Sequence, residues 1–355
     1  MTYRVVQWST GNVGRHALAG IDARPDLELV GVWVSNPQKV GVDAGELAGL
    51  GKELGVTATN DVDAILALKP DCVVHTAMAD DRLVEAIEDL QKILRAGINV
   101  VSSSPVFLQY PDGVVPTEVS GPVRQAATDG GVSLWVNGID PGFANDWLPL
   151  VITSISERID EVRCMEILNY NTYDQPTVLF DIMGFGRQLD DIPMILQPGI
   201  LTMAWGSVVR QIAAGLDVEL DGVEEWYERL EAPEDFKVDS GTIEKGTAAA
   251  LHFEVRGMKG GRPVIVLEHV TRLRDDLGPD WPQPAGHGCY RVVISGEPNY
   301  TVDLQLLGSD GDHNTAGLKA TAMRLVNAVP AVVEAKPGLL SSLDLPLITG
   351  RGLVR

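Results

Sequence analysis

Two glycines, Gly11 and Gly14, follow a β-branched apolar run that begins at Tyr3, and a helical pattern from His16 to Ala23 comes shortly after them. A strand, a glycine turn and a helix in this order bring free N–H groups and the positive end of a helix dipole to one point. Such a point can hold a dinucleotide pyrophosphate, because Gly11 lets the backbone approach the phosphates and Gly14 lets the helix pack closely on the strand. The residues expected to bind this cofactor are Thr10, Gly11, Asn12, Val13, Gly14 and Arg15.

The glycine pattern is incomplete, because Trp8 occupies the position at which a dinucleotide-binding turn carries its first glycine. Incomplete patterns of this kind also occur in strand-to-helix turns that need two glycines for packing and bind no nucleotide. A dinucleotide site and a purely structural turn are therefore both open at this point.

The loop after the second apolar run indicates which nicotinamide cofactor to expect. The run from Leu27 to Val34 predicts a buried parallel strand, and its end lies where an NAD-selective fold carries an acidic residue for the ribose diol. This sequence has Ser35 and Asn36 there, with Lys39 nearby and Arg15 across the turn. Because donors are present and no carboxylate repels a 2′-phosphate, NADP(H) is the preferred cofactor, with NAD(H) as a second candidate. A polar loop that tolerates either cofactor is the alternative.

Two further apolar runs, residues 71–76 and 99–102, predict strands that end in small hydroxyl-bearing and apolar residues. Ligands of open parallel sheets bind at strand carboxyl ends, so these ends are expected to form the walls of a nicotinamide site. The residues concerned are Thr76, Ala77, Met78, Ser102, Ser103 and Ser104. Asn327, in the last helical pattern, either reaches the nicotinamide carboxamide or caps a helical turn that Pro330 breaks.

One acidic residue and three hydrogen-bonding residues are candidates for proton chemistry. Asp140 lies in the loop after the fifth expected sheet strand, where it can act as a catalytic carboxylate or shape the turn before Pro141. A strand pattern ends at Asn169, Tyr170 and Tyr173, whose side chains can hydrogen-bond a carbonyl or an imine. A polar strand end packed against a partner subunit is the alternative for these three residues.

The histidines and cysteines do not predict a metal site. His252 and His269 fall in different strand patterns, and His287 and Cys289 have no second pair of ligands. His269 can face the substrate, or it can be a strand histidine whose ring is satisfied by its neighbours. We therefore expect no bound metal.

The composition indicates an acidic globular protein. The 355 residues are 45% hydrophobic and carry a formal net charge of −21, which argues against nucleic acid and anionic membranes as partners. The sequence has no apolar stretch of the roughly 18 residues that a membrane span needs. Three scattered cysteines provide no disulfide framework. We expect a cytoplasmic protein that acts on a small molecule.

The elements that must position these residues fall into two groups. Strand and helix patterns alternate as far as residue 150, which is typical of a doubly wound parallel sheet. Several strand patterns then follow one another, which predicts an α+β domain with a mostly antiparallel sheet, covered by a second copy of the chain in a homodimer. The expected domains are 1–150 (Rossmann, dinucleotide-binding), 151–311 (substrate binding and dimerisation) and 312–355 (a helix and tail that return to the first domain).

Seven ordered segments, spread over nearly the whole chain, resemble one enzyme superfamily. They are 8–15 (WSTGNVGR), 40–47 (VGVDAGEL), 100–103 (VVSS), 138–143 (GIDPGF), 326–330 (VNAVP), 335–340 (AKPGLL) and 344–346 (DLP). The set resembles the dihydrodipicolinate-reductase-like superfamily, and most of all its branch of 2,4-diaminopentanoate dehydrogenase and NAD(P)H-dependent amine dehydrogenases. The resemblance implies a Rossmann domain, a dimerising α+β substrate domain, and reversible reductive amination of a small ketone or aldehyde with ammonia.

The sequence departs from this superfamily at two places. Dihydrodipicolinate reductase carries a His-His-x-x-Lys motif early in its second domain, whereas residues 166–173 here contain neither histidine nor lysine, so a role in lysine biosynthesis is not expected. Amine dehydrogenases commonly place a catalytic glutamate just after the Val-x-Ser segment, where this chain has Pro105, and Asp140 is then the nearest acid in the sequence. Two alternatives stay open: an imine or carbonyl reductase that does not use free ammonia, and a catalytically silent NADP(H)-binding protein.

Overall fold

The computed structural model describes residues 2–80 and 82–354, and the chain forms two compact units. The N-terminal unit runs to Ile139 and takes in the chain again from Leu318, whereas the central unit is Asp140–Gly317. The sequence placed the domain changes at 150 and 311. The first change comes earlier because α6 (Trp147–Ile152) belongs to the central unit, where it packs Leu148 and Leu150 against the core.

A seven-stranded parallel sheet forms the middle of the N-terminal unit, in the order β15-β6-β5-β4-β1-β2-β3. Its strands are β1 (Tyr3–Trp8), β2 (Leu27–Trp33), β3 (Ala58–Thr59), β4 (Cys72–His75), β5 (Asn99–Ser102), β6 (Ser133–Val136) and β15 (Gly338–Leu340). The strand order reverses between β1 and β4, so the carboxyl ends of these two strands form the switch point at which such sheets bind ligands. The short strands β3 and β15 were not predicted.

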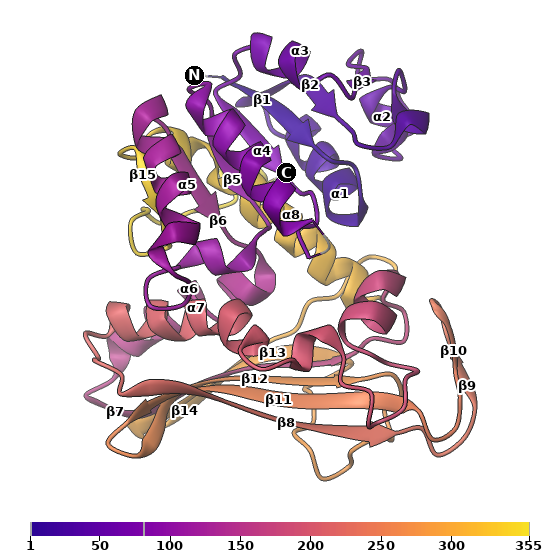
Figure 1. The fold of residues 1–355 in the computed structure, drawn as a ribbon, viewed down its shortest axis with the longest axis vertical. Coiled ribbons are helices and arrows are strands. Elements are labelled where there is room, and N and C mark those ends of the chain that lie inside the picture. Colours follow the sequence, from indigo (N-terminus) through magenta and orange to yellow (C-terminus); the bar gives the residue numbers. More distant parts are fainter. Residues whose placement is uncertain (1, 81, 355) are drawn as a thin grey trace. The chain divides into compact units, whose positions relative to one another are not determined.

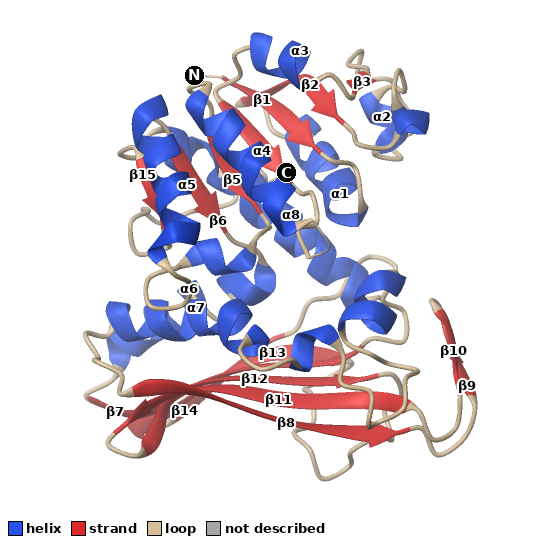
Figure 2. Cartoon of the chain, in the orientation of Figure 1, coloured by secondary structure: helices blue, strands red, loops and turns tan. Residues whose placement is uncertain are grey.

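Helices cover both faces of this parallel sheet (Figure 2). They are α1 (Asn12–Asp22), α2 (Ala44–Leu47), α3 (Val62–Ala67), α4 (Leu83–Arg95), α5 (Thr117–Gly130) and α8 (His313–Val333), with 3-10 turns at Pro37–Lys39 and Val106–Gln109. α1 and α8 pack on the face that carries Val5 and Val74. The boundary between the two units falls within α8. None of the described helices is long and apolar enough to cross a membrane.

Local sequence signals set several helix ends in the N-terminal unit. The sequence pattern predicts a short helix over 61–68 capped by Asp61, and Asp61 caps α3, because its Oδ1 accepts a hydrogen bond from the backbone N–H of Ala64 at 3.0 Å. α5 is followed by Gly131, whose φ of 66° lies in the left-handed region that glycine adopts freely. The sequence pattern also predicts a helix over 81–96. The structure has α4 there, and Asp81 itself lies outside the described residues.

The central unit is built on a six-stranded sheet in the order β14-β13-β7-β12-β11-β8 (Figure 1). Its strands are β7 (Arg158–Asn169), β8 (Gly222–Glu231), β11 (Ala248–Lys259), β12 (Arg262–Arg272), β13 (Gly288–Glu297) and β14 (Tyr300–Leu304), and β9 (Phe236–Val238) and β10 (Gly241–Ile243) form a separate hairpin. β7 and β12 run parallel, and the other neighbouring strands run antiparallel. α7 (Ile200–Gly215) covers one face of this sheet.

The fold class predicted from the sequence is confirmed, because a doubly wound parallel sheet is joined to a mostly antiparallel second sheet. β8 was not predicted. Its sequence, GVEEWYERLE, carries exposed charged residues and shows no clean alternation. Charges of this kind are typical of an edge strand, where they discourage pairing with another chain.

Candidate active site

The turn between β1 and α1 has the geometry that a pyrophosphate site requires. Gly11 immediately precedes α1, and among the described residues no side chain caps this end of the helix. A Cβ built on Gly11 would have nothing within 4 Å, whereas one on Gly14 would lie 2.3 Å from the carbonyl oxygen of Ser9. Gly11 therefore faces open space, and Gly14 brings α1 against the turn. Asn12, Val13 and Arg15 complete the first turn of this helix.

Positive charge lies at the same turn. The Nζ of Lys39 donates hydrogen bonds to the carbonyl oxygen of Thr10 at 2.9 Å and to its hydroxyl at 3.1 Å. Ser35 and Asn36 are exposed at the end of β2, where Asn36 caps a 3-10 turn by accepting the N–H of Gln38 at 2.9 Å. The loop that faces an adenosine ribose in such folds therefore offers hydroxyl, amide and ammonium groups.

The strand ends of β4 and β5 are tied together by the serines predicted at the nicotinamide site. Ser102 lies with its hydroxyl 2.8 Å from Nδ1 of His75 and donates to the carbonyl oxygen of Ser104 at 2.6 Å. Ser104 in turn donates to the carbonyl oxygen of Ala77 at 2.5 Å. Thr76 and Ala77 are buried, and Ser103 and Met78 are more accessible to solvent. Burial lowers the pKa of His75 to about 3, so this imidazole is neutral.

The structure corrects both predictions made for Asn327. Its side-chain oxygen accepts a hydrogen bond from Nη1 of Arg24 at 2.7 Å. Arg24 follows the carboxyl end of α1, which is the opposite end from the glycine turn. α8 also continues through Pro330 to Val333 because the flanking residues remain buried in the core, so Asn327 caps no broken turn. Asn327 therefore anchors one helix to another.

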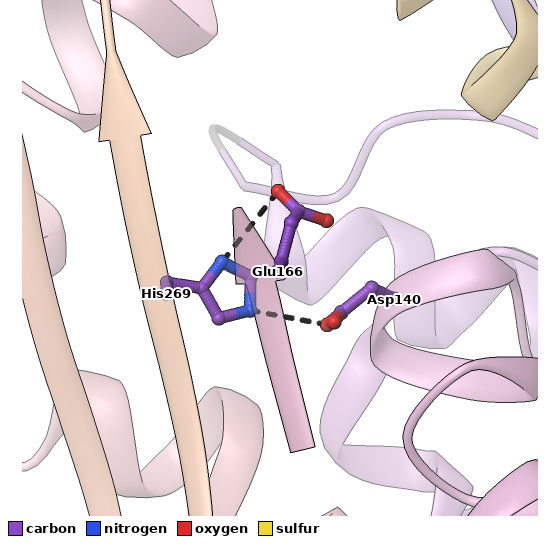
Figure 3. Close-up of side chains that lie close together, drawn as sticks. All are labelled: Asp140, Glu166 and His269. Carbon is purple, nitrogen blue, oxygen red and sulfur yellow. Dashed lines mark hydrogen bonds and ion pairs between the residues drawn. The ribbon is translucent and has the colours of Figure 1, made fainter. Parts of the chain in front are cut away.

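In the central unit, Asp140, Glu166 and His269 lie together (Figure 3). The Nε2 of His269 is 3.2 Å from Oδ1 of Asp140, and its Nδ1 is 3.6 Å from Oε1 of Glu166. The indole N–H of Trp205 donates to the same Asp140 oxygen at 3.0 Å. All three clustered side chains are buried, the most exposed being His269 at 6%. The imidazole thus stands between two buried carboxylates.

Strand register explains why these residues meet. β12 runs parallel to β7 with His269 opposite Glu166, and β13 runs antiparallel to β7 with Tyr290 opposite Glu166. Residues that stand opposite one another share a face of the sheet. The same face carries Phe253, which stacks on the His269 ring with centroids 4.7 Å apart, while Trp205 meets that ring edge-on at 4.6 Å. Two aromatic rings therefore pack against the His269 imidazole.

Burial and neighbouring charge set the protonation of this cluster. Burial raises the pKa of Glu166 to about 7, although His269 opposes the shift. Burial also lowers the pKa of His269, but the negative charges of Asp140 and Glu166 outweigh it and place that pKa above its ordinary value. An acid and an imidazole adjusted in this way can exchange protons close to neutral pH.

The structure separates the three residues predicted at the end of β7. The hydroxyl of Tyr170 donates to Oε1 of Glu166 at 2.5 Å, so Tyr170 joins the cluster, and the ring of Tyr173 lies 4.6 Å from that of Tyr170. Asn169 is not part of it. Its Nδ2 donates to Asp275 at 2.6 Å, and its Oδ1 accepts the backbone N–H two residues further on. Asn169 shapes the turn after the strand and does not point toward the proton-handling groups.

A second group of three, His252, Glu254 and Glu268, also brings histidine and carboxylate atoms within 4.8 Å of one another. Arg163 forms ion pairs with both glutamates, and Arg256 with Glu254. Because arginine N–H groups already occupy these carboxylates, the group is an ion-pair network and not a cation site.

Glu166 was absent from the predicted catalytic residues, and His269 was left open between a substrate-facing and a structural role. One sequence signal was available, since Glu166 interrupts the apolar run of a strand whose neighbouring residues are buried. A charged residue at a buried strand position needs a partner. The partner could not be identified from the sequence, because the pairing of β7 with β12 joins segments far apart in the chain.

A doubly wound nucleotide-binding sheet followed by an α+β unit with buried acid–base groups defines the class of nicotinamide-dependent dehydrogenases and reductases. Comparison with family models agrees. The model of the dihydrodipicolinate reductase N-terminus matches residues 5–103, and that of the 2,4-diaminopentanoate dehydrogenase C-terminal domain matches residues 143–352.

Individual relatives give the same family. An amine dehydrogenase from Streptomyces virginiae is 44% identical over 348 residues, which cover 96% of each chain. The 2,4-diaminopentanoate dehydrogenase of Acetoanaerobium sticklandii is 24% identical over 87% of this chain and 88% of its own. An amine dehydrogenase structure from Mycobacterium smegmatis has the same fold, with a TM-score of 0.78 and 22% identity over 99% of this chain and 98% of that one. The chain belongs to the amine dehydrogenase and 2,4-diaminopentanoate dehydrogenase family, and it is an NAD(P)-dependent oxidoreductase.

Proposed function

We propose that this protein catalyses the reversible reductive amination of a small ketone or aldehyde with ammonia. The observation that carries the proposal is the buried cluster of Asp140, Glu166 and His269, which supplies acid–base groups close to one another. The amine dehydrogenase from Streptomyces virginiae, identical at 44% of positions, is named for this kind of chemistry.

The cluster has the groups that amination needs. Addition of ammonia and loss of water both require proton transfers, and the resulting iminium is a cation. Glu166, whose pKa is about 7, can donate a proton to the leaving water and accept one from the added ammonia. The carboxylate of Asp140, held by Trp205 and His269, can stabilise the cationic carbon–nitrogen group. A bound nicotinamide cofactor supplies the hydride.

His269 connects the two carboxylates. It directs Nε2 toward Asp140 and Nδ1 toward Glu166, so a proton held on either nitrogen faces an acceptor. Phe253 and Trp205 pack against the imidazole ring and keep it in this orientation. We assign His269 the role of holding a proton between the carboxylates, so that Glu166 can change its protonation state without leaving an isolated buried charge.

We further propose NADP(H) as the preferred cofactor and NAD(H) as a weaker one. The turn before α1 fits a dinucleotide, because its helix end has no side-chain cap among the described residues and Gly11 faces open space. Lys39 is held at this turn by its hydrogen bond to Thr10, and Ser35 and Asn36 are exposed in the loop after β2. An ammonium group and neutral donors favour a 2′-phosphate over a bare ribose.

The assembly we propose is a cytoplasmic homodimer. Trp226 is 37% exposed on the face of the six-stranded sheet that points away from Phe253, and large aromatic side chains of this kind are common where subunits pack face to face. Light scattering on the purified protein tests this directly: a dimer mass is expected, and a monomer at micromolar concentration would contradict it.

Consumption of NADPH tests the proposed reaction. The purified protein is mixed with NADPH and a panel of small ketones and aldehydes, with and without concentrated ammonium at alkaline pH. Turnover that requires ammonium is expected. Turnover without ammonium would identify a carbonyl reductase, and binding of NADPH without any turnover would identify a silent binding protein, the outcome that Pro105 in place of the usual glutamate would then explain.

A further inference from the structure

The left-handed residue of the β1–α1 turn is not a glycine. Ser9 has a φ of 76°, a conformation that glycine adopts freely and other residues adopt unfavourably. Trp8 precedes it at the position of the missing glycine, fully buried and stacked on Trp33 with ring centroids 4.3 Å apart. The turn therefore needs another means of holding Ser9 in this conformation.

Gln7 and Thr76 hold the carbonyl group of Ser9 from inside the sheet. The fully buried Gln7 places its Nε2 2.8 Å from the Ser9 carbonyl oxygen and 2.8 Å from the hydroxyl of Thr76. The amide nitrogen carries two hydrogens, so both contacts can form at once. The Thr76 hydroxyl also lies 3.2 Å from the carbonyl oxygen of Trp8 and 3.3 Å from that of Ser9. Two side chains thus fix the peptide group that follows Ser9.

The other half of the Gln7 amide is not satisfied. Its Oε1 is buried, and among the described residues none donates a hydrogen bond to it. A buried acceptor without a donor is destabilising, and an apolar side chain of similar size would avoid that penalty. Packing alone therefore does not explain why a glutamine occupies this buried position. The hydrogen bonds of its NH₂ group to Ser9 and Thr76 explain it better.

Anchoring the Ser9 carbonyl has two consequences for the turn. In a trans peptide the C=O and N–H point in opposite directions, so the N–H of Thr10 faces away from Gln7. The same carbonyl oxygen would lie 2.3 Å from a Cβ on Gly14, which means that α1 packs directly on it. The position of this one oxygen therefore sets both the direction of the Thr10 N–H and the place where α1 begins.

We propose that Gln7 is a positioning residue for the cofactor pyrophosphate, and that it acts by holding Ser9 in the left-handed conformation that this turn needs. The inference rests on the proposed binding of the pyrophosphate at this turn. Because the pyrophosphate is common to both nicotinamide dinucleotides, Gln7 should contribute equally to the binding of NADPH and NADH. It should contribute little to turnover once the cofactor is bound.

Calorimetric titration of the full-length protein with NADPH and with NADH tests this role. Gln7→Met is expected to raise both dissociation constants about tenfold, the effect of losing one buried hydrogen-bonding anchor. At saturating cofactor kcat should stay within about twofold of wild type, so that the change appears in KM. Adding Ser9→Gly to Gln7→Met should restore both dissociation constants, because glycine adopts the left-handed conformation without support.

A matched control is available in the central unit. Gln211 is also fully buried, donates through Nε2 to Asp146 at 3.2 Å, and leaves its Oε1 without a partner among the described residues. Gln211→Met removes the same chemical group away from the turn and should leave both cofactor dissociation constants unchanged. If Gln7→Met does not fold, Thr76→Val removes the other anchor of Ser9, and its effect should likewise be reversed by Ser9→Gly.

Three outcomes overturn the inference. One is wild-type affinity in Gln7→Met, whatever its melting temperature. Another is an affinity loss that Ser9→Gly does not reverse, which would indicate a general structural role. The third comes from Gly11→Val, whose side chain would enter open space and block the phosphates. Wild-type NADPH affinity in that variant would place the pyrophosphate elsewhere and remove the proposed cofactor site together with the role of Gln7.

Discussion

Glu166 is a buried carboxyl group whose surroundings raise its pKa. Burial raises its pKa to about 7, so near neutral pH it exists in both protonation states. Glu166→Gln keeps the size of the side chain and removes the titration. We expect kcat for amination to fall on the order of 100-fold, which is typical of losing a general acid–base group, and the pH–rate profile to lose its limb near pH 7.

Glu224→Gln is the matched control for that variant, because Glu224 is an exposed residue of the edge strand β8. It should show the wild-type kcat and pH profile. An unchanged profile in Glu166→Gln itself would show that another group handles the proton.

The same residue predicts how stability depends on pH. The pKa of Glu166 is higher in the folded protein, at about 7, than in an unfolded chain, so its contribution to stability is complete at acidic pH and is lost as the pH rises to about 7. The pKa of His269 is also raised, so its contribution is likewise lost at rising pH.

Urea unfolding at a series of pH values measures this effect. The stability of the wild type relative to Glu166→Gln should decrease by roughly 2–3 kcal/mol between pH 4.5 and 7.5 and then level off. A stability difference that does not change with pH would show that Glu166 has an ordinary pKa in the folded protein.

Lys39 is the residue that should decide between the two cofactors. Its ammonium group donates hydrogen bonds to Thr10 in the turn between β1 and α1, and Ser35 and Asn36 are exposed in the loop after β2. Lys39→Gln should raise KM for NADPH about tenfold and leave KM for NADH nearly unchanged, because only the former carries a 2′-phosphate. Lys52→Gln, which removes an exposed lysine paired with Asp22, should change neither constant. An equal loss for both cofactors would contradict the proposed preference.

Among the elements, the β1–α1 junction depends on two glycines with different roles. Gly14 is needed for close packing, and Gly11 is needed to leave room for the cofactor. Gly14→Ala would bring its Cβ to 2.3 Å from the backbone oxygen of Ser9, so α1 must move, and we expect a loss of about 1–3 kcal/mol in stability. Gly11→Ala meets nothing within 4 Å and should keep the wild-type melting temperature while weakening NADPH binding. Comparable melting temperatures for the two variants would contradict this division of roles.

Most elements followed from sequence periodicity and from glycine, proline and capping residues. Asn99–Ser102 forms the predicted strand, and Asp61 caps α3 as expected. The elements that escaped prediction have weak signals for physical reasons. β15, Gly338–Leu340, is very short and starts beside residues that normally end a helix. Charged residues obscure the alternation of β8. Neither strand could be recognised without its neighbour in the sheet.

The candidate site was only partly predictable for a different reason. Asp140 stood out as an acid near the end of a parallel strand, and Tyr170 as a polar residue at the end of another. Their connection passes through Glu166 and His269, which meet only because β7 and β12 pair in a particular register. Strand register between segments far apart in the chain is set by tertiary packing and leaves no local mark in the sequence.

In the whole molecule, an acidic chain is expected to bind an anionic cofactor and to handle a cationic intermediate. A net charge of −21 favours the cation and opposes the dinucleotide, so the N-terminal unit needs local donors at its turn. The central unit contributes buried carboxylates and an imidazole. This order of the two units matches the two family models, since the dihydrodipicolinate reductase N-terminus matches the first part of the chain and the diaminopentanoate dehydrogenase C-terminal domain matches the second.

The most direct test of reductive amination uses isotope labels to trace the hydride and the nitrogen into the product. The protein is incubated with a ketone that it accepts, with NADPH deuterated at the transferable C4 position, and with ¹⁵N-labelled ammonium, and the products are analysed by mass spectrometry. An amine that carries both one deuterium on the former carbonyl carbon and the ¹⁵N label is the predicted product. An alcohol that carries the deuterium, with no labelled amine, would contradict reductive amination and identify a carbonyl reductase.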